Sequence, residues 1–417
     1  MPTTTLHNPP QSDLNNESTP FDPIPGAAGR RVALLAVHHV AAGGQTLTGG
    51  AEKYTRTVIR RLMDAGATVH VGYSGTAIYD DLLERYHPRK LTVEHTGWID
   101  ECLSGDSRLR IDTIRDRRRW LRSTQADTLF AVQQASGGAF GASLVAARSL
   151  GLRVAVSLRQ RPEPIGEGER KRYFGVIPSL SLWRRRLIWR RRLPALCCHA
   201  LIYNSRRVAD AYGECYGFPA GRSHVIYNGE FTHDTPPAGR TPRTIGCVGR
   251  VTEAKGADVM LDAFTIVARR HPACRLAYYG DGPMASVLAA RARVRGLGDR
   301  VVMAGYQPDR GAIYSDVDIC VQPSRRESMS NSVIEAMARG IPCVVTDVGG
   351  MREAVENEQS GFVVPQDDPA ACAEAICKLL EDQSRYARFS KAARRRTQRD
   401  FDICILMRRT IEVILGL

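Results

Sequence analysis

Two glutamates with seven residues between them, Glu327 and Glu335, could bind a ligand rich in hydroxyl groups. Glu327 lies in a polar loop, and Glu335 lies about two turns further along an apolar run with helical periodicity, at roughly 3.6 residues per turn. A loop carboxylate can accept hydrogen bonds from sugar hydroxyls, and one further along the helix could reach a ribose. Taken alone, the spacing favours a plainer interpretation, in which Glu327 is a loop charge and Glu335 a solvated helix residue.

The elements around these glutamates predict an anion-binding site. A strand over Val317–Val321, a polar loop, a helix and a second strand over Cys343–Thr346 form one βαβ unit. Ser330 and Asn331 are residues of the type that caps a helix, and they lie where this helix begins. Because the first amides of the helix and its dipole face the loop, an anion is expected to bind there.

Arg250 and Lys255 form a second candidate group. They flank a loop between a strand that ends at Val248 and a helix predicted over Ala257–Arg270. Two cations at the carboxyl end of a strand can neutralise a diphosphate leaving group as its charge develops. Taken alone, they would more often be surface charges.

Two glycine turns and one aromatic residue follow other predicted strands. Gly50 lies where the loop after the first strand, Arg31–Val37, turns into a helix, so that a ligand could approach the backbone there. A simple glycine turn is the alternative. Gly282 belongs to the tight Gly-Asp-Gly-Pro turn after the strand Arg275–Tyr279, and Tyr306 follows a further strand.

The stretch from Gln322 to Gly350 resembles the signature region of glycosyltransferase family 4, also called glycosyl transferases group 1. The Gly-Gly loop at Gly50, the Arg250/Lys255 pair and the turn at Gly282 precede it in the order that this family shows. The residues that carry the resemblance of the stretch itself are Pro323, Ser324, Glu327, Asn331, Glu335, Ala336, Met337, Ala338, Gly340, Pro342 and Thr346 to Gly350.

The resemblance implies an α/β chain with the GT-B fold, in which two facing Rossmann-like domains with parallel sheets enclose an interdomain cleft. It also implies a retaining transferase that uses a nucleoside diphosphate sugar, and catalytic roles for Arg250, Lys255 and Glu327. The two cations would hold the donor diphosphate, and Glu327 would bind the hydroxyls of the donor sugar. No cofactor or divalent metal is then required, because the cations and helix amides carry the charge.

The same resemblance implies the remaining donor contacts. Glu335 would bind the ribose, and Tyr306 would border the nucleobase, unless it is a packed aromatic at the end of its strand. The other predicted donor-binding residues are Gly50, Gly282, Ser330 and Asn331. The chain departs from the family where members often carry a histidine, since Gln133-Gln134 and Arg159-Gln160 stand there. Arg159 is either a substitute phosphate contact or a surface charge.

Length and composition predict a two-domain globular protein. The chain has 417 residues, which is more than one hydrophobic core usually serves. Hydrophobic residues make up 43% of it and charged residues 24%, as is ordinary for a globular protein. Its eleven cysteines include no C-x-x-C pair, which favours buried, reduced thiols and argues against a zinc site. The predicted ranges are a disordered tail over 1–29, an acceptor-binding domain over 30–235, a linker over 236–243, a nucleotide-sugar domain over 244–398 and a returning C-terminal helix over 399–417.

The net charge of +14 predicts an anionic partner. Residues 153–192 carry twelve arginines and lysines against three acids and end in an Arg/Trp-rich segment at 183–193. The composition of that segment favours binding to an anionic membrane surface. The alternative is that its tryptophans pack on the first domain while its arginines stay in solvent. Nucleic acid ranks last, because no nucleic-acid module accompanies the charge. Without an apolar run of the roughly 18 residues that span a bilayer, we expect a cytoplasmic protein, peripheral on the inner face of the membrane if the segment binds there.

The resemblance therefore implies a hexosyl- or N-acetylhexosaminyltransferase (EC 2.4) that uses a nucleotide sugar, with UDP preferred because the Ser-Met-Ser-Asn-Ser version of the signature is similar to members that use UDP-sugars. The acceptor is predicted to be a lipid-linked sugar in the assembly of cell-surface polysaccharide, lipopolysaccharide or glycolipid. The alternative is a protein of the same fold that binds a nucleotide sugar without turning it over.

Overall fold

The computed structural model describes residues 23–37, 50–74, 79–86, 88, 90–96, 111–133, 141–162, 195–232 and 242–417. They form two compact units, of which one comprises Asn228–Ile403 and the other the described part of Phe21–Tyr227 together with Cys404–Leu417. The Arg/Trp-rich segment at 183–193 lies outside the described residues, as do most of the predicted tail and linker.

The N-terminal unit is built on a parallel sheet. Its described strands lie in the order β3-β2-β1-β4-β5-β6-β7, so that β1 and β4 are neighbours. Its elements are β1 (Arg31–Val37), α2 (Gly50–Asp64), β2 (Thr68–Ser74), α3 (Asp80–Arg85), β3 (Leu91–His95), α5 (Ile111–Thr124), β4 (Thr128–Gln133), α6 (Gly141–Ser149), β5 (Arg153–Leu158), β6 (Ala200–Tyr203), α9 (Arg206–Tyr216), η2 (Ala220–Arg222), β7 (Ser223–Val225) and, from Cys404 onward, α17 (Ile403–Leu415).

Local sequence explains these elements. The residues of β6 are all buried, as expected for a parallel strand covered on both faces. Ser205 is the N-cap of α9, and its hydroxyl accepts a hydrogen bond from the Val208 amide at 3.2 Å. The helix ends at Gly217, which adopts the left-handed conformation with φ of 66°.

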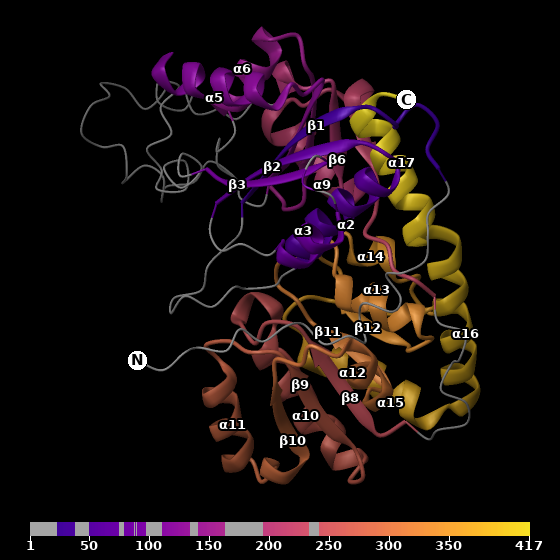
Figure 1. Ribbon diagram of the computed structural model, residues 1–417. Helices are drawn as coiled ribbons and strands as arrows, with labels where there is room; N and C mark the ends of the chain where they lie inside the picture. The colour runs from indigo at the N-terminus through magenta and orange to yellow at the C-terminus, as the bar shows by residue number, and fades with distance from the viewer. Residues whose placement is uncertain are drawn as a thin grey trace, which may run out of the picture. The chain divides into compact units, whose positions relative to one another are not determined.

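The last helix of the chain, α17, is part of the N-terminal unit (Figure 1). Arg153 donates from Nε to the carbonyl of Ile414 at 3.0 Å and from Nη2 to that of Val413 at 3.0 Å. Arg30 donates to the carbonyl of Leu415 at 3.2 Å. These arginines occupy carbonyls that the end of a helix leaves unpaired, where the dipole also favours a cation.

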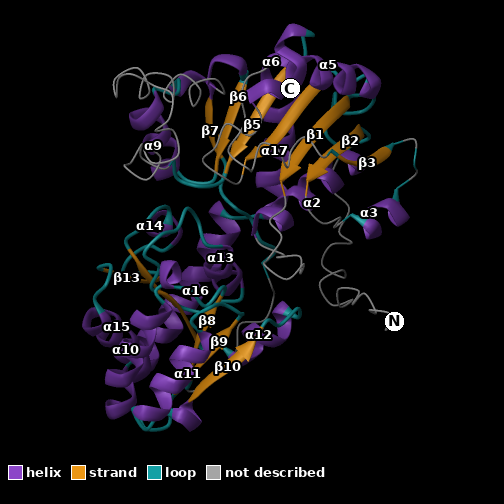
Figure 2. Cartoon of the chain, turned by 90° about the vertical axis from the view of Figure 1, so that its left-hand side faces the viewer, coloured by secondary structure: helices purple, strands orange, loops and turns teal. Residues whose placement is uncertain are grey.

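The C-terminal unit is built on a second parallel sheet, of which Figure 2 labels β8, β9, β10 and β13. The strand order is β10-β9-β8-β11-β12-β13. Its elements are β8 (Thr244–Val248), η3 (Glu253–Lys255), α10 (Ala257–Arg270), β9 (Arg275–Tyr279), α11 (Ala285–Val294), η4 (Gly298–Arg300), β10 (Val301–Gly305), α12 (Arg310–Asp316), β11 (Ile319–Gln322), α13 (Asn331–Ala338), β12 (Cys343–Thr346), α14 (Met351–Ala354), β13 (Gly361–Val364), α15 (Pro369–Glu381) and α16 (Gln383–Asp400).

The order of the C-terminal sheet fixes where a ligand can bind. From β8 the chain moves outward through β9 and β10, then returns to place β11 on the other side of β8. The loops after β8 and β11 therefore diverge at a topological switch point, the usual ligand site of an open α/β sheet. The predicted fold class, two Rossmann-like domains with parallel sheets, is confirmed.

The helices carry no membrane-spanning signal in the described part of the chain. None of those helices combines the length and the hydropathy that crossing a bilayer requires.

Candidate active site

The structure joins the two loops at the switch point of the C-terminal sheet through Lys255 and Glu327. Lys255 ends the short helix η3 after β8, and Glu327 lies in the loop after β11. The Lys255 ammonium donates a hydrogen bond to Glu327 Oε2, and the two side chains are 24% and 12% exposed. Glu327 Oε1 also accepts a hydrogen bond from the Ser328 amide at 3.2 Å. Two residues predicted for diphosphate and sugar are thus direct neighbours.

Arg250 lies at the end of β8, in the turn that leads toward Lys255, and its side chain is exposed. Gly249 precedes it with φ of 140°, a conformation that favours glycine. The guanidinium is therefore available to a ligand at the mouth of the sheet. Its role as a diphosphate contact stays a prediction.

The turn that contains Gly282 packs directly against the turn of Arg250. The Val251 amide donates to the Asp281 carbonyl at 2.9 Å, and the Met284 amide donates to the Val251 carbonyl at 3.2 Å. A Cβ atom at position 282 would lie 2.2 Å from the Val251 carbonyl oxygen. Gly282 is therefore required for this close approach of two backbones, whether or not it touches a donor.

Arg325 fastens the Glu327 loop to the beginning of α10. Its guanidinium makes two hydrogen bonds of 2.8 Å to the Asp258 carboxylate and one of 2.9 Å to the Glu253 carbonyl. The Arg325 amide donates to the Ala254 carbonyl at 3.0 Å. The hydrogen bonds from Arg325 lower the pKa of Asp258. This ion pair holds the backbone on both sides of the Lys255–Glu327 contact.

Gly349 supports Glu327 from the other side. It has φ of 51°, and a Cβ atom there would lie 1.9 Å from the Glu327 carbonyl oxygen. The Gly350 amide donates to the Ser328 carbonyl at 2.6 Å. The Gly349-Gly350 turn of the signature region therefore packs backbone to backbone against the Glu327 loop, which a residue with a side chain at position 349 would prevent.

Ser330 and Asn331 lie at the start of α13, as predicted. Ser330 is the N-cap residue and is buried, and its hydroxyl lies 2.9 Å from that of Ser332. The Asn331 side-chain oxygen accepts a hydrogen bond from Asn228. These contacts orient the two side chains, while the first amides of the helix point toward the loop, as an anion site needs.

Glu335 is buried on α13 and not solvated. Its side chain is 5% exposed, and Oε2 accepts a hydrogen bond of 2.9 Å from the Tyr314 hydroxyl, with Arg310 Nε at 4.0 Å. Burial and the nearby carboxylate raise the pKa of Tyr314 well above its usual range. The plainer interpretation of Glu335 as a solvated helix residue is wrong, because α12 covers it. Its contact with a ribose stays a prediction.

Tyr306 follows β10, and 51% of it is exposed. Its amide donates to Asp281 Oδ2 at 3.3 Å, which ties it to the turn of Gly282. The interpretation of Tyr306 as a packed aromatic at its strand end is wrong. Its contact with a nucleobase stays a prediction.

In the N-terminal unit, Gly50 begins α2 and is exposed, and the loop before it lies outside the described residues. Arg159 follows β5 and is buried, with the centre of its guanidinium 3.6 Å from the centroid of the Tyr54 ring. Arg159 is therefore not a surface charge, because it is enclosed beside an aromatic ring of α2. The alternative, a phosphate contact, stays open.

Three residues of this site were not found from the sequence: Arg325, Asp258 and Tyr314. Arg325 lies two positions before Glu327, and Asp258 lies in the first turn of α10, so complementary charges near the site were a usable signal. No local pattern in the sequence indicates that Arg325 and Asp258, 67 positions apart, form an ion pair. Likewise, no pattern predicts that the helix of Tyr314 packs over Glu335.

The arrangement combines two cations, a loop carboxylate, a buried carboxylate and the amide end of a helix at one edge of one sheet. Cations and amides stabilise phosphate oxygens, and carboxylates accept hydrogen bonds from sugar hydroxyls. Such a set can hold a nucleoside diphosphate sugar and stabilise its departing diphosphate. These features place the candidate site at the switch point of a Rossmann-like unit.

Comparison with known families agrees with this class. Residues 48–229 match the model of Glycosyltransferase Family 4, and residues 242–382 match that of Glycosyl transferases group 1. The two matches cover the two units in turn. The chain therefore belongs to the group 1, family 4 glycosyltransferases, as the signature region predicted.

Individual relatives share parts of the chain. It is 32% identical over 166 residues to the lipopolysaccharide core biosynthesis mannosyltransferase LpsB of Rhizobium meliloti, covering 38% of this chain and 47% of that protein. It is 31% identical over 223 residues to the glycogen synthase of Mycobacterium tuberculosis, covering 52% of this chain and 54% of the relative. The match thus spans about half the length of these curated relatives.

Among solved structures, the chain resembles Anabaena HepE in complex with UDP. The TM-score is 0.72 at 19% sequence identity, and the match covers 93% of this chain and 100% of HepE. At this identity the likeness establishes the fold, which is GT-B.

Proposed function

We propose that this protein is a retaining glycosyltransferase that moves a hexosyl or N-acetylhexosaminyl group from a nucleoside diphosphate sugar, preferably a UDP-sugar, to an acceptor in cell-surface polysaccharide or glycolipid assembly. One observation carries the proposal. Lys255 and Glu327, which the resemblance assigns to the donor diphosphate and the donor sugar, are held in contact at the switch point of the C-terminal sheet.

The proposed chemistry follows from charge. Arg250 and Lys255 stabilise the diphosphate as it departs, helped by the amides at the start of α13, so that no divalent metal is needed. Glu327 binds hydroxyls of the donor sugar and Glu335 the ribose. The departing phosphate takes the proton of the acceptor hydroxyl as the new glycosidic bond forms on the face that it leaves.

The comparisons support a choice of donor and acceptor for testing. HepE has been solved in complex with UDP and with UDP-glucose, which favours a uridine nucleotide. The name of the LpsB relative keeps a mannosyl donor as the second choice. A lipid-linked sugar is the proposed acceptor, because the basic segment at 183–193 suits an anionic membrane surface.

Turnover of a donor panel tests the proposal. The purified full chain is incubated with UDP-, GDP- and ADP-sugars and lipid extract in EDTA, and nucleoside diphosphate release is measured. We expect one donor to be used, and Lys255→Ala to lower kcat about 10²–10³-fold, as when one group that stabilises a transition-state charge is removed. Arg269→Ala, an exposed cation in the last turn of α10, is the matched control. The anomeric configuration of the product tests retention.

The second candidate, a protein that binds nucleotide sugars without turnover, gives a different result. Donors then bind to the wild type and to Arg269→Ala, yet no nucleoside diphosphate is released with any acceptor extract. That outcome would reject the transferase and keep the binding site.

A further inference from the structure

A second cluster of polar side chains lies at the opposite end of α10 from Lys255. The helix has 14 residues, which corresponds to about 21 Å at 1.5 Å per residue. His271 directly follows its last residue. This cluster is therefore remote from the proposed donor site, and nothing in the proposed transfer uses it.

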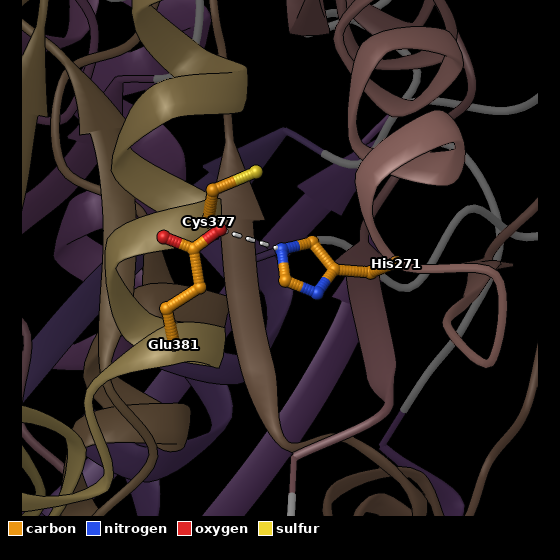
Figure 3. Close-up of side chains that lie close together, drawn as sticks. All are labelled: His271, Cys377 and Glu381. Atoms are coloured by element: carbon orange, nitrogen blue, oxygen red, sulfur yellow. Dashed lines mark hydrogen bonds and ion pairs between the residues drawn. The ribbon is translucent and has the colours of Figure 1, made fainter.

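Three side chains of different types converge there (Figure 3). His271 reaches from the end of α10, and Cys377 and Glu381 come from one face of α15, four positions apart. One ligand atom of each, the imidazole nitrogen, the thiol sulfur and a carboxylate oxygen, all lie within 4.8 Å of one another. His271 Nε2 is 3.1 Å from Glu381 Oε1.

The backbone holds these side chains in place. The His271 amide donates to the Val267 carbonyl at 2.8 Å, and the His271 carbonyl accepts from Arg300 Nη2 at 2.7 Å and from the Cys274 amide at 3.1 Å. Cys377 is fully buried in the core that α10 and α15 share. The backbone on both sides of the cluster is therefore held by hydrogen bonds and core packing, so that only the side chains need to move to bind an ion.

Neighbouring charges account for only part of this cluster. Arg270 donates to Glu381 Oε1 at 2.7 Å and to Glu374 Oε2 at 2.8 Å, so these carboxylates have partners without a metal. An arginine–carboxylate network gives no reason for a buried thiol beside the imidazole. The combination of sulfur, nitrogen and oxygen donors does point to a ligand.

We propose that His271, Cys377 and Glu381 bind one Zn²⁺ ion, with water as the fourth ligand. A thiolate disfavours Mg²⁺ and Ca²⁺, whereas zinc accepts all three donor types and commonly takes three protein ligands and a water. Bond lengths of about 2.0–2.3 Å require the ligand atoms to move closer together by roughly 1 Å. The ion would clamp α10 to α15, and the proposal does not depend on the transferase function.

The sequence carries no local signal for this site. Its cysteines form no C-x-x-C pair, and His271 and Glu381 lie 110 positions apart in the chain.

Cobalt substitution tests the site directly. The untagged full chain is freed of metal and titrated with Co²⁺, which reports a bound thiolate by a charge-transfer band in the near ultraviolet, and zinc is then used to displace it. Cys377→Ser and Glu381→Gln remove one ligand each, and the second lies on the exposed side of α15, so that it need not disturb the core. Cys372→Ser, which replaces a buried thiol of the same helix outside the cluster, is the matched control.

We expect one Co²⁺ per chain with a thiolate band that zinc abolishes. The band should be absent in Cys377→Ser, at least tenfold weaker in Glu381→Gln at equal Co²⁺, and unchanged in Cys372→Ser. A band that persists in Cys377→Ser places the metal elsewhere, and binding without any thiolate band excludes Cys377 as a ligand. Either result, or no binding, overturns the proposal.

Discussion

Lys255 donates a hydrogen bond to Glu327 across 72 residues of sequence, and this contact links the two loops at the switch point of the C-terminal sheet. A diphosphate that binds Lys255 must share its ammonium with the Glu327 carboxylate or replace that carboxylate. Glu327 therefore has two opposing effects. It competes with the diphosphate for Lys255, and it offers hydrogen-bond acceptors to the donor sugar.

These effects predict opposite changes for Glu327→Gln. UDP, which lacks the transferred sugar, should bind about fivefold more tightly. Removing the negative charge of Glu327 about 4 Å from the diphosphate, at a site accessible to water, is worth about 1 kcal/mol. Turnover of the complete donor should fall, because the amide holds the sugar hydroxyls less strongly. UDP titration and kcat on the same preparation measure both. Unchanged turnover would show that the Glu327 carboxylate has no part in binding the sugar.

Gly349→Ala tests the backbone support of the Glu327 loop. Its Cβ would lie 1.9 Å from the Glu327 carbonyl oxygen, so the loop must move. Gly296→Ala is the control, since Gly296 also has positive φ, of 70°, but open space around it, so that it reports conformational strain alone. We expect Gly349→Ala to cost about 1–3 kcal/mol more in the free energy of unfolding, as overpacking does, and to lose turnover. Equal urea midpoints for the two variants would contradict this.

Tyr314→Phe tests how Glu335 is kept buried. Removing the hydroxyl takes a hydrogen bond from a carboxylate that is 5% exposed and has Arg310 Nε at 4.0 Å. Unfolding of the C-terminal unit should be easier by about 1.5–3 kcal/mol, the usual range for a hydrogen bond to a charged group. Tyr306→Phe, which alters a half-exposed tyrosine of the same unit, is the control. A variant as stable as the wild type would mean that Glu335 does not depend on this hydroxyl.

Asp258→Asn tests the ion pair with Arg325 through pH. Because Arg325 lowers the pKa of Asp258, the folded protein binds this proton less readily than the unfolded chain, whose aspartates titrate near about 3.9. The pair should therefore add stability above about pH 4 and lose that contribution as pH falls through the folded pKa.

Urea unfolding of wild type and Asp258→Asn between pH 3 and 7 measures this difference. We expect the wild type to be more stable by about 1–3 kcal/mol at pH 7, and the gap to narrow below about pH 4. Asp262→Asn, which alters another acid of α10, paired with Arg295, is the control. A gap that stays constant with pH would show that the stability difference does not arise from the charge of Asp258.

The fold was largely predictable because parallel strands and their helices leave strong local signals. The strands Arg275–Tyr279 and Cys343–Thr346 have the predicted bounds, and so does the helix Ala257–Arg270. These are short buried apolar runs, or an amphipathic run with clear ends. By contrast, β11 covers Ile319–Gln322, one or two residues later than predicted, since apolar runs do not mark where pairing starts.

The site was predictable only in part, because spacing shows which residues follow a strand and not which side chains meet. Glu335 was expected to be reachable from solvent if it had no function, yet Tyr314 covers it from α12. The Lys255–Glu327 contact and the Arg325–Asp258 pair arise from loops of different strands. Only the order of the strands in the sheet brings these charges together.

Calorimetric titration with UDP in EDTA tests most directly whether the donor binds at the Lys255–Glu327 contact. The wild type and Lys255→Ala are compared. The wild type should bind one UDP per chain. Lys255→Ala should bind at least tenfold more weakly, since a charge-assisted hydrogen bond to phosphate is worth about 1.5–3 kcal/mol, and Arg269→Ala should equal the wild type. Equal affinity of Lys255→Ala and the wild type would contradict the account, because the nucleotide would then bind elsewhere.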